Sequence, residues 1–162
     1  MTVRSIFHIN INCSDLEASV AFYEKLGFRR AMEMAPFEGI ADESYGALGV
    51  SGGIAHVGPV VLFLGNDPRQ TRLDLMQWEK PAPGPHLQLE AYEVGVPRIA
   101  LWTKDVDELY ADLLMQGVNF LTAPQGPFPD RAIKSLVALR DPDGLLIELI
   151  EFLPGGKALY DH

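Results

Sequence analysis

An internal repeat constrains the fold of this chain more than any other feature of its sequence. Residues 8–28, HININCSDLEASVAFYEKLGF, align without gaps with residues 98–118, RIALWTKDVDELYADLLMQGV. A second gap-free alignment joins residues 65–78, GNDPRQTRLDLMQW, to residues 139–152, LRDPDGLLIELIEF. Both alignments match apolar positions, acidic positions and turn residues in the same order. The chain is therefore predicted to contain two copies of one structural unit.

The first copy carries extra chain. The two alignments have different offsets, so additional residues must lie between the helix and the last strand of the first copy. The segment 37–53, FEGIADESYGALGVSGG, is rich in glycine, contains several carboxylates and is the predicted insertion. Two roles are open for it, a lid that excludes water from a site or a disordered loop.

Each copy is predicted to run from a strand through a helix to further strands. In the first copy Ser14 and Glu17 have the spacing of a capping box, and Gly27 fits the left-handed residue that ends a helix. In the second copy an apolar stripe starts at Val106 and ends in the same way at Gly117. Further strands are predicted near residues 29–34, 55–65, 73–78, 119–122, 135–140 and 145–152.

These signals divide the chain into two modules of βαβββ order. The first module covers residues 1–79 and includes the insertion at about 37–53. Residues 80–95 are predicted to be a linker, because prolines cluster near its start. The second module covers residues 96–153, and residues 154–162 form a C-terminal tail. Asp67-Pro68 is predicted to make a hairpin turn, as is the matching DPDG of the second copy.

The first strand of the repeat alternates apolar and polar side chains. A helix covers only one face of its sheet, so the covered face must be apolar while the other is free to be polar. Phe7, Ile9 and Ile11 are therefore predicted to pack under the helix. His8 and Asn10 are predicted to point to the opposite face.

The same alternation places further ionisable groups on the polar faces. It presents Asp74 from LDLMQW, Glu148 from LIELIEF and Arg98 from VPRIALW. The repeat equates His8 with Arg98 and Asp74 with Glu148, so a pseudo-twofold pairing of the copies would bring all four onto one concave surface. The apolar neighbours predicted to face the helices are Leu73, Leu75, Ile99, Leu101, Ile147 and Leu149.

Composition excludes several classes of partner. The 22 acidic residues outnumber the 13 Lys and Arg, giving a net charge of −9, and no basic run offsets this. Such a chain repels phosphate backbones and anionic lipid surfaces, so nucleic acid and membrane partners are not expected. No apolar stretch approaches the roughly 20 residues that span a membrane. Cys13 is the single cysteine, which excludes an internal disulfide and favours a cytoplasmic location.

These motifs resemble the vicinal oxygen chelate superfamily, which includes glyoxalase I, extradiol dioxygenases and bleomycin resistance proteins. RDPDGLLIELIEF is the most specific piece, followed by HININCSDLEASVAFYEKLGF, and the similarity extends over about residues 5–152. The resemblance implies an α+β fold in which two tandem βαβββ modules form a U-shaped mixed sheet. It also implies a homodimer, and an enzyme for a small molecule with adjacent oxygens or an enolisable carbonyl, of isomerase, lyase or dioxygenase type.

The resemblance implies site residues by position. The metal ligands of the family fall on His8, Asp74 and Glu148, and Arg98 occupies the fourth ligand position. A guanidinium has no lone pair and cannot bind a metal ion, so glyoxalase I activity itself is not expected. The implied ion is divalent Fe, Mn, Ni, Zn or Mg, and a site without metal is equally open. The residues carried over as catalytic are His8, Arg98 and Glu148, and those carried over as substrate-binding are Asn10, Arg98, Trp102 and Met76.

Three interpretations of this set stay open. In the first, a metal is bound and Arg98 clamps an anionic group of the substrate. In the second, no metal is bound, Arg98 pairs with Asp74 or Glu148, and His8 acts as a general base. In the third, the protein catalyses nothing and sequesters an apolar or aromatic ligand, as bleomycin-binding relatives do, between aromatic and sulfur-containing side chains. These side chains are Trp102, Met76 and Trp78.

Three further polar residues are expected to have no part in the site. Asn12 lies near the end of its strand and is expected to face water. His56 and His86 are expected to be structural or exposed, although either would supply a second imidazole if it reached the site.

Overall fold

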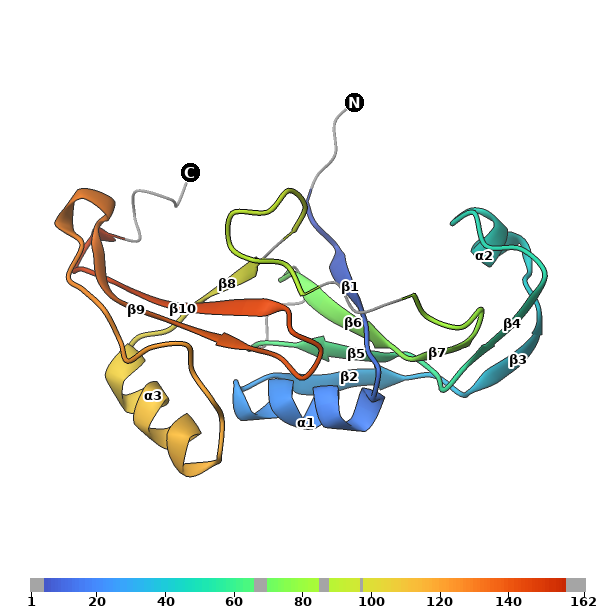
Figure 1. Ribbon diagram of the computed structural model, residues 1–162, viewed down its shortest axis with the longest axis horizontal. Coiled ribbons are helices and arrows are strands. Elements are labelled where there is room, and N and C mark those ends of the chain that lie inside the picture. Colours follow the sequence, from blue (N-terminus) through green and yellow to red (C-terminus); the bar gives the residue numbers. More distant parts are fainter. Residues whose placement is uncertain (1–4, 66–69, 85–87, 97, 157–162) are drawn as a thin grey trace. The chain divides into compact units, whose positions relative to one another are not determined.

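The computed structural model describes residues 5–65, 70–84, 88–96 and 98–156 (Figure 1). The chain divides into two units, Met1–Pro85 and His86–His162. The predicted hairpin at Asp67-Pro68 and the residue His86 lie outside the described residues. None of the helices in the described ranges has the length and apolar character needed to cross a membrane.

A four-stranded sheet with the order β1-β6-β5-β2 forms the centre of the first unit. The first strand pairs in parallel with β6, and the other two pairings are antiparallel. Helix α1 connects β1 to β2 and contacts β6. The bounds are β1 (His8–Asn12), α1 (Leu16–Lys25), β2 (Arg29–Glu33), β5 (Val60–Phe63) and β6 (Arg72–Met76).

The core of the first unit lies between this sheet and α1. From the helix, Val20 and Tyr23 are fully buried, and from the sheet Leu75 is fully buried and Ile11 and Leu73 nearly so. Burying an aliphatic side chain of this size contributes about 1.5–3 kcal/mol, so this face holds the helix in place. The predicted orientation of these strands toward the helix is confirmed.

Phe7 departs from the alternation. Its side chain is 66% exposed, so the prediction that it packs under the helix is wrong. The reason is that β1 begins only at His8, and the alternation of faces does not extend to a residue that precedes the strand.

The residue that begins α1 also differs from the prediction. Asp15, and not Ser14, is the N-cap, and its carboxylate accepts a hydrogen bond from the backbone N–H of Ala18 at 3.0 Å. The helix ends as expected, because Gly27 has the positive φ of 91° that other residues disfavour.

The insertion forms secondary structure of its own. One strand of the insertion joins a second sheet of the first unit, with the order β3-β4-β7. The insertion also forms a short helix. The disordered-loop alternative is therefore wrong, and the lid alternative stays a prediction. The strand predicted near 55–65 is divided between this sheet and the main one. The bounds are β3 (Phe37–Ile40), α2 (Glu43–Gly46), β4 (Gly53–His56) and β7 (Trp78–Lys80).

Gly58 explains the division between β4 and β5. Its φ is +114°, and a Cβ atom at this position would clash with the carbonyl oxygen of Met34. Only glycine combines this backbone conformation with such a close approach. The turn separates the strand that serves the insertion from the strand that serves the main sheet.

The second unit contains a three-stranded sheet with the order β8-β10-β9. Strand β8 pairs in parallel with β10, β9 pairs antiparallel with β10, and α3 contacts both β9 and β10. The strand predicted near 119–122 is reduced to one bridge between Phe120 and Leu139. The bounds are β8 (Arg98–Trp102), α3 (Val106–Met115), the 3-10 helix η1 (Pro129–Arg131), β9 (Ile133–Arg140) and β10 (Leu146–Phe152).

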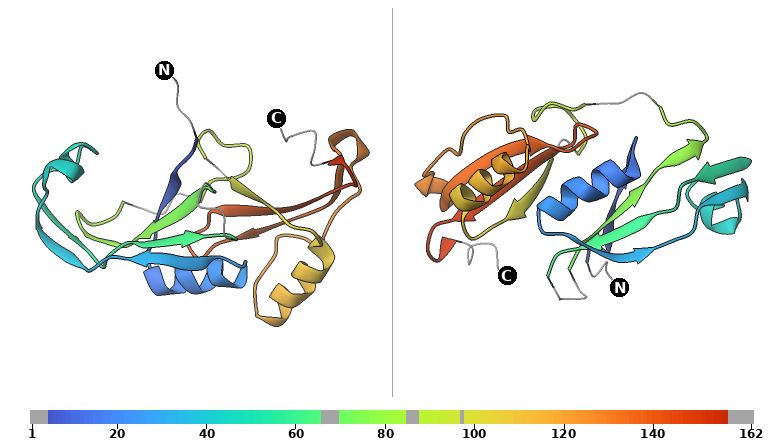
Figure 2. Two further views of the ribbon diagram at one scale, coloured as in Figure 1. Left: turned by 180° about the vertical axis from the view of Figure 1, so that it is seen from behind. Right: turned by 90° about the horizontal axis from the view of Figure 1, so that it is seen from below.

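The second unit repeats the packing of the first. Val106 and Leu113 of α3 are fully buried, as is Ile147 of β10, and Leu149 is 1% exposed. Figure 2 shows each helix lying across one face of its own sheet. The α+β fold class implied by the resemblance is confirmed.

Residues predicted to form a linker contribute to both units. The first residue of the predicted linker, Lys80, is the last residue of strand β7. At the other end, the guanidinium of Arg140 donates to the carbonyl of Leu89 at 3.1 Å and to the carboxylate of Glu90 at 3.2 Å. The exact module boundaries stay a prediction.

Candidate functional site

A row of polar side chains lies on the open face of the main sheet of the first unit. The parallel register of β1 and β6 places His8 beside Arg72 and Asn10 beside Asp74. Because neighbouring residues in register share a face, these four side chains lie opposite the face that α1 covers.

A pocket of about 440 Å³ opens on this face. Two predicted site residues, His8 and Asp74, line it together. The remaining lining is mostly apolar and comes from β2, β5, β6 and the residues beside β1 and β2. The other lining residues are Phe7, Ala31, Met32, Met34, Val61 and Arg72.

A β-bulge shapes the apolar wall of this pocket. Between β2 and β5 the register shifts, with Arg30 opposite Leu62 and Met32 opposite Val61, so Ala31 is an extra residue in β2. Ala31 and Met32 are consecutive and yet both line the pocket. A bulge redirects side chains in this way, which is why bulges are frequent beside binding sites.

Asp74 carries the clearest indication of a ligand. Its Oδ1 atom is buried and has no hydrogen-bond partner among the described residues. Leaving a buried acceptor unsatisfied costs about 1–3 kcal/mol, because the atom loses water and gains nothing in return. A ligand that brings a hydrogen-bond donor or a cation into the pocket would recover this cost.

Arg72 belongs to the pocket but was missed by the sequence reasoning. Its guanidinium lies over the ring of Phe7, 4.9 Å from the ring centroid. The sequence did hold a signal, because Arg72 stands two residues before Asp74 on one strand and so must share its face. The repeat does not reveal Arg72, because the equivalent position in the second copy is the apolar Leu146.

In the second unit, Arg98 and Glu148 are an ion pair. The Nε atom of Arg98 donates to Oε2 of Glu148 at 2.8 Å. Glu148 is one of the two partners expected for Arg98 in a site without metal. The Arg98 side chain is 46% exposed, so the pair contributes about 1 kcal/mol or less to stability. On the same strand as Arg98, Trp102 is 51% exposed.

The first unit does not by itself assemble the full donor set of a protein-bound metal ion. No group of three or more His, Cys, Asp and Glu side chains is placed to hold an ion anywhere in the described ranges. The pocket of the first unit offers two such side chains, His8 and Asp74, and Arg72 brings a positive charge beside them. The third predicted ligand, Glu148, already accepts from a guanidinium. With the His8 and Asp74 side chains alone, water or substrate oxygens would have to fill the remaining positions around a divalent ion.

Asn12 is exposed at the end of β1 and also has a specific hydrogen-bond partner. Its side-chain oxygen accepts a hydrogen bond from Nε1 of Trp78 at 3.0 Å. This bond connects the end of β1 to the insertion sheet. Asn12 is exposed, as expected, and this bond adds a contact with a distant segment.

An aromatic cluster fills one face of the insertion sheet. His56 lies in register with Phe37 on one side and Trp78 on the other, and the three rings pack with Tyr45 of α2. His56 is 4% exposed, its Nε2 lies 2.6 Å from the hydroxyl of Tyr45, and its buried Nδ1 has no partner among the described residues. Burial raises the pKa of the Tyr45 hydroxyl. His56 is thus buried within the aromatic cluster of the insertion sheet, and a purely structural role for it stays a prediction.

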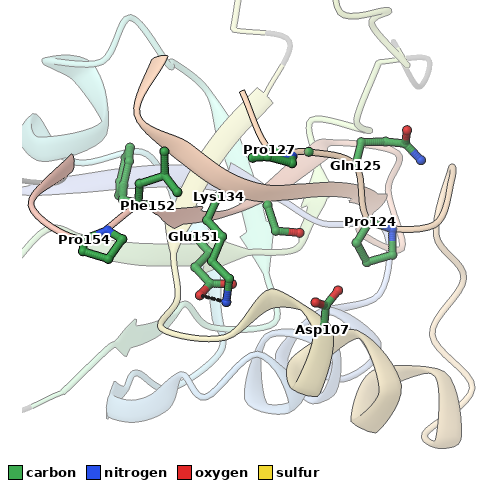
Figure 3. Close-up of a pocket in the computed structure, with 11 residues that line it drawn as sticks. Asp107, Pro124, Gln125, Pro127, Lys134, Glu151, Phe152 and Pro154 are labelled. Carbon is green, nitrogen blue, oxygen red and sulfur yellow. Dashed lines mark hydrogen bonds and ion pairs between the residues drawn. The ribbon is translucent and has the colours of Figure 1, made fainter. Parts of the chain in front are cut away.

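A second pocket, of about 770 Å³, lies in the second unit at the start of α3 (Figure 3). Glu151 is 6% exposed there, and it accepts from Nζ of Lys134 at 2.7 Å and from the backbone N–H of Val106 at 3.2 Å. The hydrogen bond from Lys134 to Glu151 raises the pKa of the lysine. Glu151 could have been found from the sequence. It stands two residues after Leu149 on the same strand, so its carboxylate must lie on the face that the helix covers.

The fold and the pocket define a class, the α+β proteins assembled from βαβββ modules with polar residues on an open sheet face. The chain belongs to the Glyoxalase/Bleomycin resistance protein/Dioxygenase superfamily, whose profile matches residues 5–149. The resemblance inferred from the sequence is thereby confirmed. No curated protein sequence matches the chain.

Several solved structures share this fold. A glyoxalase family protein from Bacillus cereus is 18% identical over 95% of this chain and 97% of that chain, with a TM-score of 0.79. The trypanothione-dependent glyoxalase I of Leishmania major is 24% identical over 98% of this chain and 91% of its own, with a TM-score of 0.64.

A third structure shows how diverse the ligands of this fold are. It is a variant of the fosfomycin resistance protein FosX from Listeria monocytogenes, in complex with Mn(II) and 1S,2S-dihydroxypropylphosphonic acid. It is 16% identical over 92% of this chain and 93% of that chain, with a TM-score of 0.59. At these identities the likeness establishes the fold.

Proposed function

We propose that this protein is an enzyme that moves a proton on a small molecule with adjacent oxygens or an enolisable carbonyl. The observation that carries the proposal is the buried, unpartnered Oδ1 of Asp74 in a pocket that His8 also lines. An active site must accept groups that only the substrate brings, and so it often leaves a polar atom unsatisfied in the free protein.

The proposed roles follow from the chemistry of the two side chains. His8 lies at the exposed start of β1, where its imidazole takes a proton from the carbon beside the substrate carbonyl and returns it to the neighbouring carbon or oxygen. Asp74 accepts a hydrogen bond from the substrate hydroxyl and so fixes which carbon faces His8. No step in this scheme requires a bound metal.

The other predicted residues enter the proposal as the resemblance implies. Arg98 would bind an anionic group, Glu148 would act in acid–base chemistry, and Asn10, Trp102 and Met76 would contact the substrate. Because Arg98 pairs with Glu148, we favour the metal-free interpretation over the set of His8, Asp74 and Glu148 as ligands for Fe, Mn, Ni, Zn or Mg. Metal analysis of the purified protein, before and after EDTA, tests this choice.

Solvent deuterium exchange tests the proposed reaction. A panel of enolisable carbonyl compounds is incubated with the protein in D₂O, and loss of the carbon-bound proton is followed by ¹H NMR. We expect catalysed exchange with at least one compound. His8→Gln and Asp74→Asn should each slow it by about 10²-fold or more, since acid–base groups contribute about 10²–10⁴-fold.

Asp130→Asn is the matched control, because it removes an exposed carboxylate from η1 in the second unit. It should leave the exchange rate unchanged. A wild-type protein that exchanges no compound on the panel, or variants that exchange as fast as wild type, would refute the assigned roles.

A metal-free binding or antibiotic-sequestering protein is the alternative. The apolar wall favours it, since Met32 and Met34 are 52% and 44% exposed around the pocket. Methionine-rich surfaces bind varied apolar ligands. Tight binding of bleomycin or an aromatic ligand by calorimetry, with no product after hours of incubation, would support this alternative over the enzyme.

We also propose that the protein is a homodimer, as the resemblance implies. Light scattering coupled to size-exclusion chromatography should give twice the chain mass of 17.9 kDa. A mass that stays at one chain across a concentration series would contradict the dimer.

A further inference from the structure

We propose that the pocket of the first unit binds a small 2-hydroxy acid, with its carboxylate on Arg72, its hydroxyl on Asp74 and an apolar substituent against Met32, Met34 and Val61. This inference rests on the proposed function in one respect, namely that this pocket is the substrate site. It adds the chemical class of the ligand and a specificity-determining residue, Arg72.

The position of Arg72 favours an anion. Arg72 is half-buried and lies beside His8 in the register of β1 and β6, so its guanidinium is the positive group on the pocket wall next to the proposed base. Its contact with the face of Phe7 limits how the planar group can turn. A guanidinium held in one plane presents paired N–H donors that match the two oxygens of a carboxylate.

The state of Asp74 decides which ligand group faces it. A carboxylate on the ligand would be repelled there, because both groups would carry negative charge and neither would donate. A hydroxyl donates into the unpartnered Oδ1 and satisfies it. The ligand must therefore offer an anion and a donor at the same time, at two separate points.

The spacing of the two protein groups sets the size of the ligand. Arg72 and Asp74 are alternate residues of one strand, so their Cα atoms are about 6.6 Å apart, and the long arginine side chain can shorten the gap between the functional groups. A hydroxyl on the carbon next to a carboxylate fits this span. A ligand with widely separated groups would not engage both residues within a pocket of about 440 Å³.

The opposite wall explains the apolar substituent. The bulge at Ala31 turns Met32 toward the pocket, and Met34 and Val61 complete the wall. Covering these side chains with a branched alkyl group removes apolar area from water, which favours binding. A short polar acid would leave the wall exposed.

Three probes separate the contributions of the two polar contacts. They are 2-hydroxy-4-methylpentanoate, 4-methylpentanoate, which lacks the hydroxyl, and 4-methylpentane-1,2-diol, which lacks the carboxylate. Dissociation constants are measured by calorimetry or by NMR titration. For the wild-type protein we expect the hydroxy acid to bind at least about tenfold more tightly than either of the others, since each polar contact contributes about tenfold or more.

Variants assign each preference to its residue. Arg72→Gln should remove the preference for the hydroxy acid over the diol, and Arg72→Lys should restore part of it, because lysine keeps the charge but loses the paired donors. Asp74→Asn should weaken the preference for the hydroxy acid over the plain acid. Arg131→Gln makes the same chemical change at an exposed residue of η1 and should change nothing. Circular dichroism and thermal melting check that each variant is folded.

The outcomes distinguish this inference from the proposed function. Equal binding of the three probes, an unchanged preference in Arg72→Gln, or no binding of the hydroxy acid at millimolar concentration would each overturn the ligand class. If the protein also exchanges protons on a neutral carbonyl compound, the proposed reaction survives that failure. If instead the hydroxy acid binds as expected and nothing exchanges, the ligand class stands and the enzyme fails.

Discussion

The two units of the chain have the same plan and treat their matched polar residues in opposite ways. In the first unit the acidic residue of β6, Asp74, faces a pocket with an unpartnered oxygen. In the second unit the matched residue, Glu148, is neutralised by Arg98 of the neighbouring strand. Replacing His8 by Arg98 at equivalent positions therefore converts an open polar site into an ion pair. A repeat preserves the position of a side chain but does not preserve its environment.

The starts of the two helices make the same comparison. The first backbone N–H of α1 is bonded by the amide of Gln77 at 2.9 Å, and that of α3 by the carboxylate of Glu151 at 3.2 Å. These residues are equivalent in the repeat. The neutral amide needs no counter-ion, whereas the nearly buried carboxylate is paired with Lys134. The first N–H of the helix is thus bonded by a neutral acceptor in one unit and by a charged acceptor in the other.

The largest expected effect on stability comes from removing the charged acceptor, Glu151. Glu151→Ala should lower the free energy of unfolding by about 2–3 kcal/mol, because it deletes a nearly buried acceptor and the bond to Val106. Gln77→Ala should cost about 1 kcal/mol, since the neutral amide is a weaker acceptor. Urea denaturation measures both. An equal loss in the two variants would show that the charge at Glu151 adds nothing.

Substituting the matched acidic residues of β6 and β10 should change the free energy of unfolding in different ways. Asp74→Leu should raise the free energy of unfolding by about 1–2 kcal/mol, because it replaces an unsatisfied buried acceptor by an apolar side chain. Glu148→Leu should lower it slightly or leave it unchanged, since that carboxylate is already paired. Thermal and urea melts test the contrast. A destabilised Asp74→Leu protein would mean that the orphan oxygen is satisfied in solution, for instance by water.

The ion pair itself should be weak and sensitive to salt. Arg98→Gln is expected to cost about 1 kcal/mol or less at low ionic strength, because the arginine is half exposed. The cost should shrink as salt is raised toward 1 M, where screening is strong. A loss that is large and independent of salt would indicate that Arg98 has a packing role.

The smallest expected effect is a shift at high pH. Glu151 raises the pKa of Lys134, so the folded state holds this proton more tightly than the unfolded state. The resulting stabilisation is present below the ordinary lysine pKa of about 10.4 and is lost as the pH rises through the higher folded value. The difference in unfolding free energy between wild type and Glu151→Gln should therefore narrow above about pH 10. Parallel curves across this range would contradict the assignment.

Much of the fold could be predicted from the sequence. The alternation of β1 and β6 predicted that Ile11, Leu73 and Leu75 face the helix, and the structure buries all three. The alternation of side chains between the two faces is a local property, because the geometry of a strand sets it. They failed where the element ended, at Phe7, and where two capping residues were adjacent, at Ser14 and Asp15, because element ends depend on contacts beyond the local pattern.

The candidate site was less predictable. Sequence reasoning selected Asp74 and His8, and both line the pocket, but it passed over Arg72 and left two partners open for Arg98. It also allowed a disordered insertion, where the structure has a sheet with the buried ring of His56. The pocket lining, the partner of Arg98 and the structure of the insertion all depend on which distant segments come into contact. A pattern of residue types does not specify those contacts.

The sequence by itself determined the repeat and the faces of its strands, because these follow from short-range periodicity. Its motifs also carried the resemblance that identified the family. Only the tertiary structure decided that Asp74 lacks a partner while Glu148 has one, and that a bulge at Ala31 completes an apolar wall. Those outcomes depend on how side chains from distant segments satisfy or exclude one another. The free energy of a buried polar atom is set by these neighbours and not by its own position in the chain.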